Sequence, residues 1–335
     1  MRRVAFHTLG CKVNFYDTDA VAETFRRRDY EVVPWGGAVP ADVYVINTCS
    51  VTNTGAKKSR QFIRRAVQQN PRAIVVAMGC YAQFAPGEVA RIPGVDLVVG
   101  SHRRGEIVAE VERIAAGERP TQPINLVENL LKQRTYEELP ARSFDGRTRA
   151  TLKVQDGCNA FCAFCQIPWS RGKNRSRRPE HVVGEAKALA ELGYREVVVS
   201  GVHIGTYGAD LEQPLDLAEL LARLHDVAGL ERIRLSSIDP HEVTDRLIEA
   251  LVSLPRVCRH LHVAAQSGDD DVLLAMRRRN RAGECRARIE RLRSRLPDIA
   301  VTTDIIAGFP GETEAQFQNT LDFCRALEFS KVHVF

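Results

Sequence analysis

The sequence CNAFCAFC, from Cys158 to Cys165, decides how the rest of this chain is interpreted. It comes two residues after 151–155, which we predict to be a β-strand, so the three cysteines are expected on a loop at a strand end. Three thiolates at this spacing can bind one small inorganic centre. A structural zinc ion needs four ligands, and the nearest histidine, His181, lies well beyond a tight loop. An iron–sulfur cluster with only three cysteines would keep one iron open for another ligand.

Strand-like and helical patterns alternate from this loop to the end of the chain. Strands are predicted at 151–155, 196–200, 232–236, 261–264, 300–305 and 332–335. Helices are predicted at 182–192, 217–227, 244–254, 270–278, 284–295 and 314–327. This repetition is typical of a full or partial parallel barrel, in which the active site lies at the carboxyl ends of the strands.

The first part of the chain alternates in the same way. Strands are predicted at 4–9, 43–46, 74–78 and 97–99, and helices at 16–28, 57–69 and 107–115. We therefore expect an α/β fold, with a parallel sheet covered on both faces, over residues 1–116. Residues 117–146 contain three prolines and have mixed polarity, which predicts a linker, and the barrel-like domain follows over 147–335.

Three more cysteines, Cys11, Cys49 and Cys80, each come just after a predicted strand of the first domain. In a parallel sheet these positions meet at one edge, where such sheets usually bind their ligands. Taken singly, each cysteine is more typical of a small buried apolar residue than of a ligand. Their repeated placement favours a second set of ligands. Cys258, Cys285 and Cys324 fit neither set, and we expect ordinary thiols there.

Composition limits the location and the partners. The chain has 335 residues, nine cysteines and a net charge of +5. It contains no apolar run of about 18 residues, which predicts no membrane segment, and we see no secretory signal, so a cytoplasmic protein with thiolate chemistry is expected. Basic residues concentrate at 142–178, around the CNAFCAFC loop, and at 277–295. The first patch suits a polyanionic partner, whereas the second could also be a solvated helix face.

The CNAFCAFC loop after the first barrel strand resembles the radical S-adenosylmethionine (SAM) enzymes. The resemblance implies a partial (βα)6 barrel, with Cys158, Cys162 and Cys165 as ligands of a 4Fe–4S cluster. In that family the open iron binds SAM, and an electron from the cluster cleaves SAM to a 5′-deoxyadenosyl radical.

The whole chain resembles the methylthiotransferase branch of these enzymes. The matching segments are TLGCKVN at 8–14, NTCSVT at 47–52, GC at 79–80, QDGC at 155–158, SGVHIGTYG at 200–208, QSG at 266–268 and DIIAGFPGET at 304–313. The branch implies a second 4Fe–4S cluster on Cys11, Cys49 and Cys80, which carries the sulfur that is delivered to the substrate. One SAM donates a methyl group to that sulfur, and another supplies the radical.

Three substrates compete within the branch. They are isopentenyladenosine in tRNA, N6-threonylcarbamoyladenosine in tRNA, and an aspartate of a ribosomal protein. TLGCKVN, GVHIGTYG and RLSSI at 234–238 most resemble the threonylcarbamoyladenosine enzymes. The resemblance also implies a reductant protein of the flavodoxin or ferredoxin type and a sulfur donor. A different class, an iron–sulfur or zinc binding module without catalysis, stays open at this point.

Candidate binding residues follow from the same motifs. Residues expected to bind SAM at strand ends are Ser200, Gly201, Ser236 or Ser237, Gln266 and Asp304. Arg171, Arg175 and Arg177 are candidates for contact with a phosphate-rich substrate. No catalytic side chain is expected beyond the cluster ligands, although His203 and His241 could act in catalysis.

The family carries a C-terminal β-barrel, the TRAM domain, that binds RNA or a protein substrate. This sequence ends at Val332-His333-Val334-Phe335, inside the sixth predicted strand. We therefore expect a barrel that is incomplete at its sixth strand, no TRAM domain, and weak binding of tRNA by this chain alone.

Overall fold

The computed structural model describes residues 2–117, 119–142 and 146–335, and the chain divides into two compact units. The first unit contains Met1–Gly146, Gly157–Asn159 and Gln166–Lys173. The second contains Arg147–Asp156, Ala160–Cys165 and Asn174–Phe335. Within the described residues, no helix is both long enough and apolar enough to cross a lipid bilayer.

The first unit is built on a six-stranded parallel sheet in the order β2-β1-β3-β4-β5-β6. The strands are β1 (Arg3–Thr8), β2 (Glu31–Val33), β3 (Val43–Thr48), β4 (Ile74–Gly79), β5 (Leu97–Val98) and β6 (Ile124–Asn125). The central strands β3 and β4 are buried along their whole length, as expected when both faces of a parallel sheet are covered.

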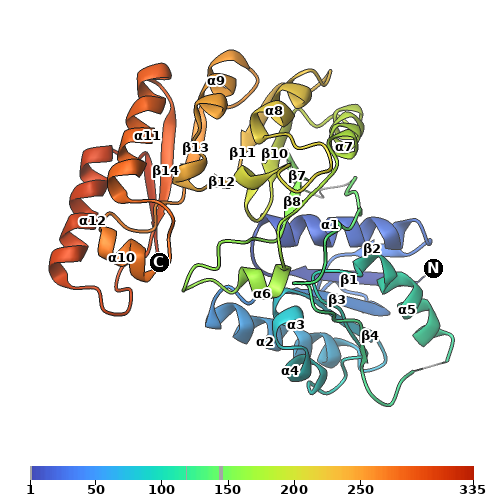
Figure 1. Ribbon diagram of the computed structural model, residues 1–335. Coiled ribbons are helices and arrows are strands. Elements are labelled where there is room, and N and C mark those ends of the chain that lie inside the picture. Colours follow the sequence, from blue (N-terminus) through green and yellow to red (C-terminus); the bar gives the residue numbers. More distant parts are fainter. Residues whose placement is uncertain (1, 118, 143–145) are drawn as a thin grey trace. The chain divides into compact units, whose positions relative to one another are not determined.

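Helices cover both faces of this sheet (Figure 1). They are α1 (Lys12–Arg26), α2 (Asn53–Gln69), α3 (Cys80–Phe84), α4 (Pro86–Ala90) and α5 (Ile107–Ala115). Apolar side chains of α1 and α5 pack on one face, and those of α2, α3 and α4 pack on the other. The sheet covered on both faces that the sequence predicts is therefore confirmed.

Residues 117–146, predicted as a linker, take part in the first unit. They contribute β6, which pairs with β5 at the edge of the sheet. Glu137 forms an ion pair with the buried Arg104 at 2.9 Å, and Leu139 accepts a hydrogen bond from Tyr16. A 3₁₀ turn, η1 (Arg104–Glu106), precedes α5.

The second unit consists of parallel strands that alternate with helices, as the sequence predicts (Figure 1). Three strands form the order β11-β10-β7, four form the order β12-β13-β14-β15, and a short antiparallel pair joins β8 to β9. The strands are β7 (Ala150–Lys153), β8 (Gln155–Asp156), β9 (Arg175–Ser176), β10 (Glu196–Ser200), β11 (Arg232–Leu235), β12 (Ser237–Ile238), β13 (His260–Val263), β14 (Ala300–Ile305) and β15 (Lys331–Val334).

The strands β11 and β12 are one stretch of chain interrupted only at Ser236. This stretch pairs with β10 before the break and with β13 after it, so the two groups of strands share it. The resulting series of parallel strands is the partial barrel that the sequence predicts.

Helices connect the strands of this second series. The helices are α6 (Ile167–Arg171), α7 (Pro179–Glu191), α8 (Leu217–His225), α9 (Asp245–Ser253), α10 (Asp270–Ala275), α11 (Ala282–Arg295) and α12 (Glu314–Leu327), with 3₁₀ turns η2 (Ile204–Thr206) and η3 (Pro240–Glu242). Helix α7 buries Val182, Ala186 and Leu189, which lie four and three residues apart on one helical face. Helix α6 is the exception, because it packs with the first unit.

Candidate metal centres

Cys11, Cys49 and Cys80 lie at the carboxyl ends of β1, β3 and β4. Cys11 is the residue before α1, Cys49 directly follows β3, and Cys80 is the first residue of α3 after β4. Since β1, β3 and β4 are neighbours in a parallel sheet, the three cysteines lie at the same edge.

Close packing and electrostatics show that the three thiols are near one another. A Cβ added to Gly10 would lie 3.1 Å from Cys49 Sγ, and Gly10 has a φ of +104° that favours glycine. Burial raises the pKa of the Cys49 thiol. A backbone hydrogen bond at Val51 acts to lower that pKa, while the nearby Cys80 and Cys11 act to raise it further.

The chemistry of this donor set fits an iron–sulfur cluster. Cys49 and Cys80 are buried, whereas Cys11 is exposed. A buried cation, Arg171, lies beside Cys80, with its Nε 3.3 Å from Cys80 Sγ. Thiolates bound to iron need such compensation of charge, because each carries a negative charge out of water.

The loop that carries Cys158, Cys162 and Cys165 has a tightly defined backbone. The Cys158 N–H donates to the carbonyl of Gly172 at 2.9 Å, and the Cys165 N–H donates to the carbonyl of Cys162 at 3.0 Å. Gly157 has a φ of +77°, and a Cβ there would lie 1.9 Å from the Lys173 carbonyl oxygen. Only glycine therefore fits before Cys158.

This second set also fits an iron–sulfur centre. All three cysteines are partly exposed, which leaves their sulfur atoms accessible to a metal. Arg278 Nη1 lies 3.6 Å from Cys162 Sγ, and Arg278 Nη2 donates to Asp239 Oδ1 at 2.7 Å. Each set of cysteines thus has an arginine with a largely buried side chain beside one of its sulfur atoms.

The predicted SAM-binding residues lie at the carboxyl ends of neighbouring strands. Ser200 ends β10 and Gly201 follows it, Ser236 lies between β11 and β12, Gln266 follows β13, and Asp304 lies in β14. Gln266 has a φ of +71°, and its N–H donates to the Asp304 carbonyl at 2.9 Å. The Ser236 hydroxyl is buried and has no hydrogen-bond partner within the described residues.

The sequence analysis missed a polar network that lies after the same strands. His203 Nε2 lies 2.7 Å from Glu242 Oε1 and 3.4 Å from Asp239 Oδ2. Burial acts to raise the pKa of Asp239, but the hydrogen bond from His203 and the charge of Arg278 outweigh it and lower that pKa to about 2. The segments GVHIGTYG and RLSSI point to this region, but periodicity does not reveal that their flanking polar side chains meet.

The three arginines predicted to bind substrate are almost completely buried. Their exposed fractions are 1% for Arg171, 2% for Arg175 and 2% for Arg177. Arg177 is paired with Glu185, and Arg171 donates to Asp17 at 2.8 Å. A guanidinium already buried and paired offers no accessible charge to a phosphate, so the structure does not support direct binding by these residues.

Cys258, Cys285 and Cys324 belong to neither set; Cys285 is buried, and the other two are partly exposed. Burial is the largest influence on each of them and raises the pKa of all three, that of Cys285 to about 12.

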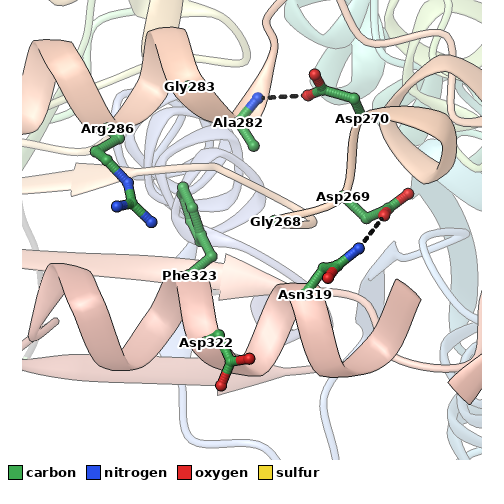
Figure 2. Close-up of a pocket in the computed structure, with 9 residues that line it drawn as sticks. All are labelled: Gly268, Asp269, Asp270, Ala282, Gly283, Arg286, Asn319, Asp322 and Phe323. Carbon is green, nitrogen blue, oxygen red and sulfur yellow. Dashed lines mark hydrogen bonds between the residues drawn. The ribbon is translucent and has the colours of Figure 1, made fainter. Parts of the chain in front are cut away.

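A pocket of about 470 Å³ lies between α10, α11 and α12, and Figure 2 shows the residues that line it. Asp269 accepts a hydrogen bond from Asn319, and Asp270 accepts one from the Ala282 N–H, each at 2.8 Å. The pocket contains none of the predicted site residues.

Two family descriptions match the chain. The radical SAM superfamily matches residues 152–324, and a family described as uncharacterized protein family UPF0004 matches residues 3–100. The threonylcarbamoyladenosine tRNA methylthiotransferase MtaB of Bacillus subtilis is 48% identical over the whole of this chain, which covers 73% of that protein. MtaB of Thermotoga maritima is 38% identical, with 74% of that protein covered.

Two further comparisons bear on substrate and fold. The tRNA-2-methylthio-N(6)-dimethylallyladenosine synthase of Mycobacteroides abscessus is 38% identical, and the chain covers 67% of it. The solved structure of the radical SAM methyltransferase TsrM from Kitasatospora setae has a TM-score of 0.75 over 100% of this chain and 73% of that one. At 15% identity, that likeness shows the fold alone.

The superfamily match over residues 152–324 establishes that the protein is a radical SAM enzyme, as the CNAFCAFC loop predicts. Within the superfamily, the chain belongs to the methylthiotransferase family. Membership implies 4Fe–4S clusters and SAM as cofactors, which confirms the cofactors predicted from the sequence.

Proposed function

We propose that this protein is a tRNA methylthiotransferase that converts N6-threonylcarbamoyladenosine to its 2-methylthio derivative. The observation that carries this proposal is 48% identity over the whole chain to a threonylcarbamoyladenosine enzyme. The similarity to a dimethylallyladenosine synthase, at 38%, is lower over a comparable length. The chain has two separate sets of three cysteines, one of them at the edge of the six-stranded sheet, and this agrees with a two-cluster enzyme.

Each cysteine set has one role in this proposal. Cys158, Cys162 and Cys165 bind the cluster at which SAM binds, and Cys11, Cys49 and Cys80 bind the second cluster. When bound, these groups supply the electron, the 5′-deoxyadenosyl radical and the sulfur for transfer. The protein supplies orientation and a site from which water is excluded.

SAM binding is assigned to residues at the carboxyl ends of the second unit's strands. The buried Ser236 hydroxyl and the positive-φ backbone at Gln266 present polar groups there. Ser200, Gly201 and Asp304 complete the proposed surface on the neighbouring strands. A site at these ends is the usual arrangement in parallel barrels.

The tRNA phosphates need exposed cations, which the buried Arg171, Arg175 and Arg177 do not provide. Arg277 and Arg279 flank the partly buried Arg278 in sequence and are themselves exposed. We assign phosphate contacts to these two arginines, because a phosphate backbone is bound chiefly by accessible Lys and Arg.

Two partners complete the reaction. Reduction of the clusters requires a one-electron donor protein of the flavodoxin or ferredoxin type, and repeated turnover requires a sulfur donor. Since tRNA is the substrate, the reaction takes place in the cytoplasm.

Nucleoside mass spectrometry tests the proposal. In a strain that lacks the gene, tRNA should contain threonylcarbamoyladenosine without the methylthio group, and the gene should restore it. Loss of methylthio from isopentenyladenosine instead would assign the dimethylallyladenosine substrate. Unchanged nucleosides would rule out a tRNA substrate.

A further inference from the structure

We infer that Arg171 is the positioning residue of the Cys11, Cys49 and Cys80 centre, and that it sets the electrostatics of the cluster bound there. This inference rests on the proposed function, because it requires a cluster on those cysteines. It gives Arg171 a role that is distinct from the substrate contact predicted from its basic neighbourhood.

The Arg171 guanidinium contacts the side chains of Cys80, Asp17 and Asn14. Three of its nitrogen atoms have three different partners: Nε lies 3.3 Å from Cys80 Sγ, Nη1 lies 2.8 Å from Asp17 Oδ2, and Nη2 lies 2.5 Å from Asn14 Oδ1. A planar guanidinium can satisfy three such directions at once, whereas a lysine ammonium is a single point of charge on a flexible chain.

The partners of Arg171 are themselves fixed. Asn14 donates its amide to the Leu9 carbonyl at 2.7 Å and to the Thr48 carbonyl at 3.1 Å, so its Oδ1 faces Arg171. Cys80 Sγ lies 3.7 Å from the same Oδ1. The sulfur of Cys80 therefore has two polar neighbours, Arg171 and Asn14, and backbone carbonyls at the sheet edge set the orientation of the Asn14 amide.

Simple neutralisation of Asp17 does not explain the contact with sulfur. Asp17 is also paired with Arg104, which in turn pairs with Glu137 at 2.9 Å. The two negative charges of Asp17 and Glu137 match the two positive charges of Arg104 and Arg171, without any charge on Cys80. The Nε of Arg171 nevertheless lies against Cys80, where it would donate a charge-assisted hydrogen bond to a thiolate.

The backbone on both sides of Arg171 holds its side chain next to Cys80. Helix α6, which ends at Arg171, packs against α3, which begins at Cys80 (Figure 1). The next residue, Gly172, has a φ of +73°, and a Cβ there would lie 2.4 Å from the Leu130 carbonyl oxygen. A larger residue would displace this turn and the guanidinium with it.

Residues 171 and 172 also contact one cysteine of each set. The Arg171 side chain lies against Cys80, and the Gly172 carbonyl accepts the hydrogen bond of the Cys158 N–H at 2.9 Å. Two consecutive residues thus contact a sulfur of the second cluster's set and the backbone of the first ligand of the radical SAM set.

A hydrogen bond and a positive charge at a ligand sulfur stabilise the more negative, reduced state of a cluster. Removing them should therefore lower the midpoint potential of the cluster on Cys11, Cys49 and Cys80. Loss of such an outer partner typically costs about ten- to hundredfold in metal affinity or activity.

The test uses the full chain with Cys158→Ala, Cys162→Ala and Cys165→Ala, so that only the other set can bind a cluster. After anaerobic reconstitution, iron content, midpoint potential and the rate of iron loss to a chelator are measured for this protein and for two further variants. Arg171→Gln should shift the potential in the negative direction and lose iron about tenfold faster or more. Arg171→Lys, which retains the charge, should shift the potential less.

Arg177→Gln is the matched control, because it removes an equally buried arginine that pairs with Glu185 in the second unit. Its potential and rate of iron loss should equal those of the background protein. Equal values for Arg171→Gln and the background would overturn the inference. If the background protein itself binds no iron, the two-cluster function fails first and the inference falls with it.

Discussion

Two arginines with largely buried side chains show the same arrangement at the residue scale. Arg171 lies against Cys80 and Arg278 lies against Cys162, and a carboxylate fixes each guanidinium. Thiolates bound to a cluster are poorly solvated, so a fixed cation next to the sulfur stabilises them. The sequence alone predicts both arginines as parts of basic patches, because composition does not tell an inward-pointing arginine from an exposed one.

Gly157 is the residue whose replacement should most directly disturb the CNAFCAFC loop. Gly157→Ala should destabilise the protein by at least about 1 kcal/mol from backbone strain alone, and the clash with the Lys173 carbonyl should displace Cys158. Reduced iron occupancy and a lower denaturant midpoint are expected.

Gly184→Ala is the control for Gly157→Ala. Gly184 is exposed within α7, and no atom lies within 4 Å of a Cβ added there. Its replacement should therefore stabilise the protein by up to about 1 kcal/mol. Equal effects at both positions would contradict this explanation.

Asp239 should make stability depend on pH in acid. Its pKa is lowered from an ordinary value of 3.8 to about 2, which corresponds to about 2 kcal/mol of stability at neutral pH. Because the folded-state pKa is the lower one, this contribution is complete above about pH 5 and is lost as pH falls through the interval towards 2. The stability difference between the wild type and Asp239→Asn should therefore shrink between pH 5 and pH 3 in denaturant titrations.

The control for this experiment is Asp298→Asn, which removes a surface partner of Arg259. An exposed ion pair contributes little, so this variant should unfold nearly as the wild type does at each pH. If the difference in free energy of unfolding between the wild type and Asp239→Asn stays constant from pH 7 to pH 3, the charge of Asp239 is not the cause of that difference.

At the scale of elements, helices and strands with a strong periodic pattern are predicted well from the sequence, whereas very short ones are not. The predicted strands 196–200 and 300–305 match β10 and β14 over their full length, and the predicted helix 107–115 matches α5. The three-residue strand β2 and the five-residue helix α3 are too short to give a periodic signal. Strand β6 was predicted as part of a linker, because its two residues form a strand only by pairing with β5.

Helix α2 fixes the backbone next to Cys49 and provides a test at this scale. Ser59, completely buried in α2, accepts a hydrogen bond from the Cys49 N–H at 3.1 Å. Ser59→Ala should leave this buried N–H unsatisfied and cost about 1–3 kcal/mol. Iron bound by Cys11, Cys49 and Cys80 should decrease, while iron bound by the other set should not.

Lys58→Ala is the matched control, because it changes the preceding residue on the exposed side of α2. Neither its unfolding midpoint nor its iron content should change measurably. If Ser59→Ala reduces iron at both cysteine sets equally, α2 acts on overall stability rather than on Cys49.

At the scale of the whole molecule, the chain does not divide at one point in the sequence. Gly157–Asn159 and Gln166–Lys173 pack with the first unit, whereas the residues between them, Ala160–Cys165, pack with the second. A boundary near residue 147 can be predicted from sequence, because strand and helix patterns restart there. The return of the chain to the first unit depends on tertiary contacts such as that of Arg171 with Cys80, which have no local signal.

The central claim is that two separate sets of three cysteines each bind a 4Fe–4S cluster. Metal analysis after anaerobic reconstitution with iron and sulfide tests it most directly. The wild type should bind about eight irons per chain, and replacement of either set of three by alanine should leave about four. Zinc bound in place of iron would contradict this claim. So would a wild type that binds only about four irons, if replacing one set removes all of them and replacing the other set removes none.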